Sequence, residues 1–158
     1  MQRLNRYRDF IDAHRDRFLD LLRIYLGAAL VLKGLAFVRD GSALAENIQQ
    51  AHLAWADFIL AHYVVLAHVC GGLLLAAGMM TRLAALAQLP VLVGAVFFVH
   101  APEGLFAPTM GLEVSILVLF LLVLFAVAGG GRWSVDYYLS RSDLRASAAL
   151  ARERARPV

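Results

Sequence analysis

The sequence contains a single cysteine, Cys70, and few charged residues for its length. A lone cysteine excludes an intrachain disulfide, a Cys-x-x-Cys redox pair and a four-cysteine metal site. Ser115 and Ser134 have no recognisable base or oxyanion motif nearby, so nucleophilic catalysis has no support either. The sequence therefore predicts no catalytic residue and no metal ligand set, and any redox role cannot depend on dithiol chemistry of its own.

Charged residues make up 17% of the 158 positions, whereas 61% are hydrophobic and the mean hydropathy is +0.67. Soluble domains are about 45–50% apolar. The charges gather near the two ends and leave four apolar runs, each close to the ~20 residues that cross a bilayer core. We expect an all-α, integral membrane four-helix bundle that forms one domain over residues 1–158. The predicted spans are 18–38, 58–80, 83–99 and 112–128, followed by a tail at 129–158.

Short interfacial helices are expected at both termini and in the first loop outside the membrane. Residues 1–17 alternate arginines with aspartates and place apolar side chains near one helical face. Residues 39–57 suggest a short helix lying on the surface. Ser134 is placed to cap a helix that begins the tail.

The arginines and lysines predict the orientation of the chain. The N-terminus, the turn at Arg82 and the tail share one side and hold twelve of the fifteen. By the positive-inside rule, both termini are cytoplasmic in a bacterial inner membrane. The net charge of +3 favours contact with anionic membrane lipids, and no motif supports nucleic-acid binding.

One stripe of the second span is predicted to pack against another helix. His68, Gly72 and Ala76 recur every four residues, which places them on one helical face. Small residues at this spacing let two helices approach closely in lipid. His68 should therefore face protein and not acyl chains.

Three short motifs carry a family resemblance. They are residues 22–27 (Leu-Arg-Ile-Tyr-Leu-Gly), residues 71–85, which include Gly78-Met79-Met80-Thr81-Arg82-Leu83, and residues 131–136 (Gly-Arg-Trp-Ser-Val-Asp). With these motifs the sequence resembles the DoxX family of four-helix bacterial membrane proteins. The resemblance implies a four-helix bundle in which Arg82, Arg132 and Trp133 are structural motif residues. Some members are DoxD-like small subunits of a thiosulfate:quinone oxidoreductase, and others are linked with membrane-bound thiol and superoxide defence.

Five ionisable residues are candidates for a ligand site on the outer side of the bundle. They are Lys33, His62, His68, His100 and Glu113, of which His68 lies deepest. Ionisable groups within a membrane are costly and usually face the bundle interior. One hypothesis is a polar pocket that opens outward and binds a quinone headgroup, an anion or a metal. The alternative is a set of interfacial residues that each reach water or a headgroup separately.

The sequence leaves three functions open. The first is a small inner-membrane subunit of a redox system that binds a quinone or a similar amphiphile and works with a membrane or soluble redox partner. The second is a non-enzymatic scaffold or assembly partner, and the third is a small-solute transporter that acts as a homo-oligomer. Haem ligation by two histidines is disfavoured, because the histidine spacing has no specific signature.

Overall fold

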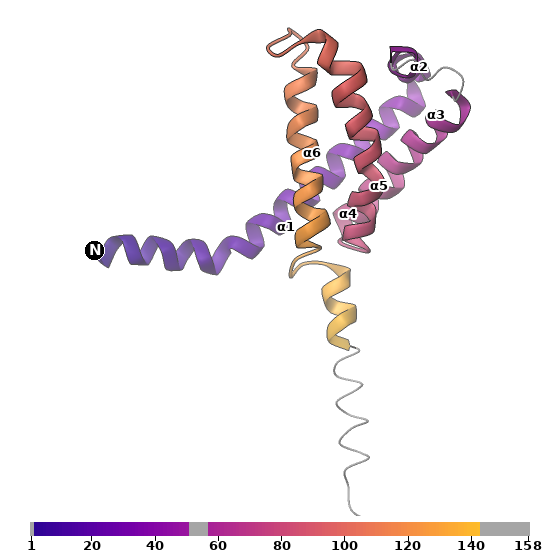
Figure 1. Ribbon diagram of the computed structural model, residues 1–158. Coiled ribbons are helices and arrows are strands. Elements are labelled where there is room, and N and C mark those ends of the chain that lie inside the picture. Colours follow the sequence, from indigo (N-terminus) through magenta and orange to yellow (C-terminus); the bar gives the residue numbers. More distant parts are fainter. Residues whose placement is uncertain (1, 51–56, 143–158) are drawn as a thin grey trace, which may run out of the picture.

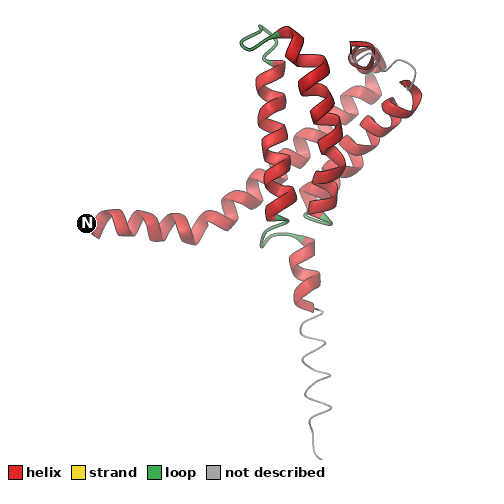
Figure 2. Ribbon diagram, viewed as in Figure 1, coloured by secondary structure: helices red, strands yellow, loops and turns green. Residues whose placement is uncertain are grey.

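The computed structural model describes residues 2–50 and 57–142 (Figure 1). The described residues contain four helical segments that are long and apolar enough to cross a membrane. They are Arg17–Arg39, Phe58–Ala77, Thr81–His100 and Gly111–Ala128. Helices account for almost all of the described chain, and the connections between them are short (Figure 2). The predicted all-α membrane bundle is confirmed.

The first span belongs to a longer helix, α1 (Gln2–Arg39). We expected a separate interfacial helix before this span, but the structure shows one continuous helix. Residues 2–26 of α1 contain no proline or glycine, so nothing in the local sequence interrupts the backbone hydrogen bonds. Figure 1 shows α1 running alongside the second span and crossing α5 and α6 obliquely, with its N-terminal part leaving the bundle.

The connection after α1 contains the helix that we expected in the first loop, α2 (Gly41–Gln50). Leu44 and Ile48 of α2 are buried with Phe37 of α1 and pack against the second span. Part of the predicted surface helix, residues 51–56, lies outside the described residues. The described part of the helix, α2, is therefore held by a small apolar cluster that is separate from the core of the bundle.

The second and third spans each combine an α-helix with a wider π-helical turn. The second span comprises α3 (Asp57–Leu66), the π-turn η2 (Ala67–Gly71) and α4 (Gly72–Ala77). The third comprises α5 (Thr81–Gly94) and the π-turn η3 (Ala95–His100). A 3₁₀ turn, η4 (Ala101–Glu103), leads to the fourth span, α6 (Gly111–Ala128).

The second span ends before the predicted boundary at residue 80. Its last helical residue is Ala77, because Gly78 adopts the left-handed conformation (φ 70°) that ends many helices. Met80 is also left-handed (φ 49°), and α5 then begins at Thr81. The turn between these two spans is therefore very short and holds the α4 and α5 helices side by side.

Glycines allow α1 to pass very close to α4. A Cβ atom added to Gly27 would lie 2.5 Å from the backbone nitrogen of Ala76. A Cβ atom on Gly72 would lie 2.9 Å from the carbonyl oxygen of Gly27. The Gly72 and Ala76 stripe thus faces α1, and the two backbones touch where side chains would keep them apart.

The core of the bundle is an apolar cluster from four helices. It includes Leu26 of α1, Leu75 of α4, Ala85 of α5 and Leu122 of α6. Large apolar side chains also cover the outside, where Phe58 is 76% exposed and Phe120 is 64% exposed. Outward-facing apolar side chains on membrane-spanning helices contact lipid.

The close α1–α4 approach predicts the effect of enlarging Gly72. Replacing Gly72 by leucine should lower the free energy of unfolding by at least ~1–3 kcal/mol, the usual cost of overpacking. The new side chain would meet backbone atoms of α1, which cannot move as a flexible side chain can. Unfolding in mixed detergent micelles measures the change.

Leu73→Ala is the matched control, because Leu73 is the next residue along the chain and is 56% exposed. Truncating a side chain that faces lipid leaves no cavity within the protein, so stability should change little. Equal stability of the Gly72→Leu and Leu73→Ala variants would contradict the close approach of α1 to α4.

Candidate functional site

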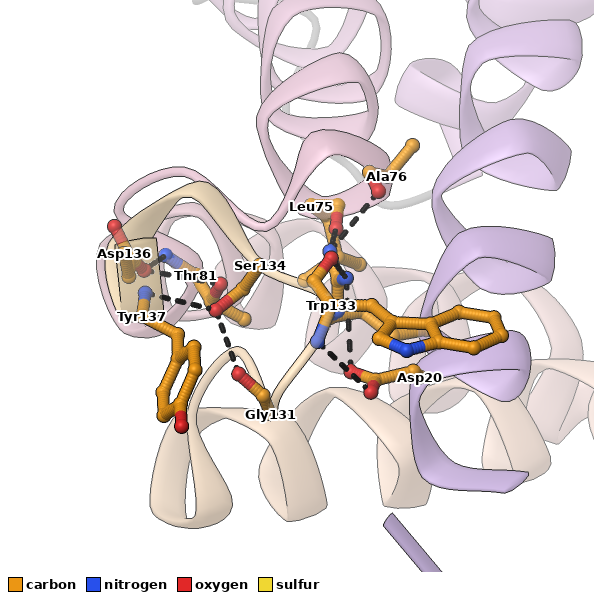
Figure 3. Close-up of polar contacts among 10 residues, drawn as sticks. Asp20, Leu75, Ala76, Thr81, Gly131, Trp133, Ser134, Asp136 and Tyr137 are labelled. Carbon is orange, nitrogen blue, oxygen red and sulfur yellow. Dashed lines mark hydrogen bonds and ion pairs between the residues drawn. The ribbon is translucent and has the colours of Figure 1, made fainter. Parts of the chain in front are cut away.

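The three motif segments meet at one end of the bundle and form a buried polar cluster (Figure 3). We use the name end cluster for Asp20, Arg23, Thr81, Ser134 and Asp136, which come from α1, the start of α5 and the chain after α6. The first four are at most 1% exposed. Charged side chains so deeply buried require partners. Both Nη atoms of Arg23 and Oδ2 of Asp20 form hydrogen bonds, whereas Arg23 Nε and Asp20 Oδ1 form none among the described residues.

Arg23 is completely buried and joins α1 to two other parts of the chain. Its Nη1 donates hydrogen bonds to the carbonyl oxygens of Leu75 (2.5 Å) and Ala76 (2.9 Å). Its Nη2 donates to the carbonyl oxygen of Trp133 at 3.0 Å. The first two oxygens belong to the last turn of α4, where carbonyls carry partial negative charge, and Leu75 O also accepts a hydrogen bond from the backbone nitrogen of Gly78. Arg23 therefore satisfies the end of α4 and the chain after α6 together.

Asp20 completes this arrangement from the same face of α1. Its Oδ2 accepts a hydrogen bond from the backbone nitrogen of Trp133 (3.0 Å), and its Oδ1 lies 3.8 Å from Arg23 Nη2. A Cβ atom on Gly131 would collide with Asp20 Oδ1, so only glycine leaves room there. The sequence indicated that Asp20 and Arg23 neutralise each other at the interface, but it did not reveal their contact with Trp133.

Asp136 ties the chain after α6 to the start of α5. Its carboxylate accepts hydrogen bonds from the backbone nitrogens of Met80 (2.8 Å) and Thr81 (3.1 Å) and from Thr81 Oγ1 (3.2 Å). Its own backbone nitrogen donates to Gly78 O at 3.1 Å. A residue remote in sequence thus caps α5, which has no side-chain cap of its own.

Ser134 starts the short helix over residues 135–142, as its position in the sequence predicted. Its Oγ accepts a hydrogen bond from the backbone nitrogen of Tyr137 (3.1 Å) and donates to Gly131 O (2.7 Å). This is the geometry of a helix N-cap. The rest of the predicted tail, residues 143–158, lies outside the described residues.

The structural motif residues lie around this cluster in different environments. Gly72 and Ala76 face α1, as described above. Arg82, Arg132 and Trp133 are exposed, and Trp133 enters the cluster only through its backbone. The buried polar residues of the three motifs are Arg23, Thr81 and Ser134.

Two of the predicted ligand residues, Lys33 and His68, meet around the ring of Phe37. The Nζ of Lys33, on α1, lies 5.0 Å from the centroid of this ring. The His68 ring, in η2, contacts the same ring edge-to-face with centroids 5.6 Å apart. His68 is 6% exposed, whereas Lys33 is exposed. The Phe37 ring therefore contacts both an exposed cation and a buried imidazole.

A second pair, His100 and Glu113, lies where η3 and α6 come together. A Cβ atom on Gly111 would lie 2.5 Å from His100 Nδ1, so the imidazole sits directly on the start of α6. Glu113 Oε1 accepts a hydrogen bond from the backbone nitrogen of Phe106 and holds the connection between the two spans. These two residues thus belong to a different helix pair from Lys33 and His68.

His62 differs from His68 although both make the same local hydrogen bond. The Nδ1 of His62 lies 2.7 Å from Phe58 O, and the Nδ1 of His68 lies 2.9 Å from Val64 O. Each contact reaches four residues back along the helix. His62 is exposed, however, and packs on Phe58 of its own helix.

A buried glutamine near His68, Gln88, was not among the predicted site residues. Gln88 of α5 is 0% exposed, and its Nε2 donates a hydrogen bond to Ala67 O at 2.6 Å. Ala67 begins the π-turn η2, in which the helical hydrogen bonds are rearranged. An amide side chain in an otherwise apolar span was the available signal, because such a group needs a partner away from lipid.

Among the described residues, no group of three histidine, cysteine, aspartate or glutamate side chains is arranged to hold a metal ion. The comparison with protein families matches the DoxX family model over residues 18–101. The chain belongs to the DoxX family. The match begins at the first span and ends just after the third, so in this DoxX protein α6 and the exit motif lie beyond it. No curated protein and no solved structure matches the chain.

The DoxX motif contacts predict that Arg23 is essential for stability. Replacing Arg23 by methionine removes three hydrogen bonds to backbone carbonyls and leaves the Asp20 charge buried without its partner. Breaking a buried charge pair in this way costs about 3–5 kcal/mol. We expect a loss of this size in the free energy of unfolding, measured by denaturation in mixed micelles.

Arg17→Gln is the control, because Arg17 is an exposed arginine on the same helix and the change removes the same charge. Its stability should stay close to that of the unchanged protein. If Arg23→Met were as stable as Arg17→Gln, the buried hydrogen bonds would not hold the bundle together.

Proposed function

We propose that this DoxX protein is a small membrane subunit of a bacterial redox system and binds the headgroup of a quinone or a similar amphiphile at His68. The supporting observation is a buried imidazole within a membrane span, fixed by a hydrogen bond to Val64 O and by the ring of Phe37. A buried ionisable side chain in a membrane is by default a candidate for function.

The hydrogen bond to Val64 determines what His68 offers a ligand. A carbonyl oxygen only accepts, so Nδ1 must carry the proton. In the neutral ring, Nε2 is then an acceptor, suited to a hydroxyl of a reduced quinone. Lys33, which also contacts the Phe37 ring, is a donor suited to a carbonyl of the oxidised form. Together the two residues supply the acceptor and the donor that the two redox states require.

The backbone around His68 also favours a ligand site. His68 lies in the π-turn η2, and single π-turns within α-helices occur frequently at functional sites. Gln88 holds the Ala67 carbonyl at the start of this turn and leaves its own Oε1 buried without a hydrogen-bond partner among the described residues. A second buried acceptor therefore lies beside the residue that precedes His68.

The electrons for such a ligand come from another protein, because a chain with only one cysteine has no dithiol pair to supply them. The partner is a membrane or soluble redox protein. We place the chain in the inner membrane with both termini in the cytoplasm, so that His68 lies near the middle of the bilayer; the arginine distribution supports this orientation.

A second candidate function is a scaffold that holds a soluble protein at the membrane. The observation that favours it is the length of α1, whose N-terminal part leaves the bundle (Figure 1). This part carries most of the N-terminal arginines and aspartates. A scaffold needs no site at His68, so a binding measurement separates the two functions.

His68→Ala tests the proposal. Losing the hydrogen bond that the buried Nε2 of His68 accepts from the ligand should weaken binding of a ubiquinone analogue about tenfold. Titration of the purified protein in nanodiscs with the analogue, followed by tryptophan fluorescence or calorimetry, measures the dissociation constant. Thermal melting of the same samples shows whether the variant is folded.

His62→Ala is the matched control, because His62 makes the same hydrogen bond four residues back but is exposed. It should bind the analogue as the unchanged protein does. Equal affinity of the two variants, or no binding by the unchanged protein, would refute the quinone site and favour the scaffold.

A further inference from the structure

A cleft of about 580 Å³ opens beside the end cluster. It lies between the start of α5, the end of α6 and the short helix over residues 135–142. Thr81 begins the third span and Ala128 ends the fourth, and both line the cleft. The cleft is therefore located at the boundary between the hydrocarbon core and the headgroup layer.

Arg82 supplies a positive charge to this cleft. The side chain is exposed, and the ion pair between Asp20 and Arg23 does not involve it. Its Nε lies 3.4 Å from the position of a Cβ atom on Gly129. The absence of a side chain at Gly129 (φ 82°) thus leaves the guanidinium room against the end of α6.

A second cation, Arg141, contacts one of the residues that line the cleft. Tyr137 lines the cleft, and its ring lies 5.6 Å from the guanidinium carbon of Arg141. Arg141 Nη1 also donates a long hydrogen bond of 3.5 Å to the Tyr137 hydroxyl. Arg82 and the Arg141–Tyr137 pair therefore approach the same cleft from two different helices.

One carboxylate, Asp136, also lines the cleft. Its oxygens already accept hydrogen bonds from two backbone nitrogens and from Thr81 Oγ1 at the start of α5. Its negative charge is offset by the positive end of that helix. The uncompensated charge in the cleft is consequently positive.

We propose that this cleft binds the phosphate of an anionic phospholipid, with Arg82 as the principal contact. A guanidinium matches the geometry of phosphate oxygens and forms paired, charge-assisted hydrogen bonds with them. Basic pockets between membrane helices are suited to anionic headgroups. A zwitterionic headgroup carries its own cation, and that cation competes with Arg82 for the phosphate.

The apolar part of the cleft favours a lipid over a soluble phosphate. Met80 and Leu83 line it and are 53% and 57% exposed, and Ala128 lies beside them at the end of α6. These side chains provide a surface for the glycerol and the first methylenes of acyl chains. A soluble phosphate would gain nothing from that surface.

Native mass spectrometry of the full chain tests this site. The protein is released from nanodiscs made of equal parts phosphatidylglycerol and phosphatidylcholine, and the retained lipids are counted. The unchanged protein should retain phosphatidylglycerol selectively. Arg82→Gln should reduce that retention about tenfold, the loss expected for one charge-assisted hydrogen-bonding group, and Arg82→Lys should fall between the two.

Arg17→Gln is the control, because it removes one exposed arginine at the same end of the bundle without touching the cleft. It should retain phosphatidylglycerol as the unchanged protein does. Melting temperatures of all variants should match, since both arginines are exposed.

Glycerol 3-phosphate distinguishes the two possible sources of the phosphate. This soluble headgroup has no acyl chains and should not displace the retained lipid at millimolar concentration. Displacement would show that the cleft takes a soluble phosphate and would overturn the lipid assignment. Retention by Arg82→Gln equal to that of the unchanged protein, or equal retention of phosphatidylcholine, would overturn the site itself.

Discussion

The burial of the Arg23 guanidinium determines how the rest of the bundle is arranged. A cation removed from both water and lipid headgroups needs hydrogen-bond acceptors and a balancing charge. Carbonyl oxygens at the end of α4 and the carbonyl of Trp133 accept from the two Nη atoms, and the carboxylate of Asp20 balances the charge, whereas Nε has no hydrogen-bond partner among the described residues. Each partner belongs to a different part of the chain, so satisfying one side chain fixes α1, the second span and the exit from α6 together.

Glycines make these contacts geometrically possible. Gly27 and Gly72 let α1 approach α4 closely enough for Arg23 to reach the last turn of that helix. Gly78 ends α4 in a left-handed conformation, and a Cβ atom there would lie 2.5 Å from Arg23 Nη1. Gly131 likewise leaves space for Asp20. The glycine-rich character of the DoxX motifs thus follows from the packing of a large cation into a narrow space.

The sequence predicted the spans well because hydropathy and length are local properties, and the Ser134 cap is local too. It did not predict the continuity of α1, the two π-turns or the capping of α5 by Asp136. The last contact joins residues 55 positions apart, and no local pattern encodes it. Of the candidate site, the depth of His68 could be inferred from sequence. The need of the Gln88 amide for a partner could also be inferred, but its contact with Ala67 could not, because that contact depends on how the second and third spans pack.

Solid-state NMR of the protein in bilayers tests the central claim most directly. Arginine labelled with ¹⁵N and leucine and alanine labelled at the ¹³C carbonyl would report which atoms surround the Arg23 guanidinium. We predict dipolar contacts from the Arg23 Nη atoms to the carbonyl carbons of Leu75 and Ala76, and none to lipid ³¹P, with an Arg23→Met sample to assign the signals. A guanidinium in contact with lipid phosphorus and not with these carbonyls would contradict the account.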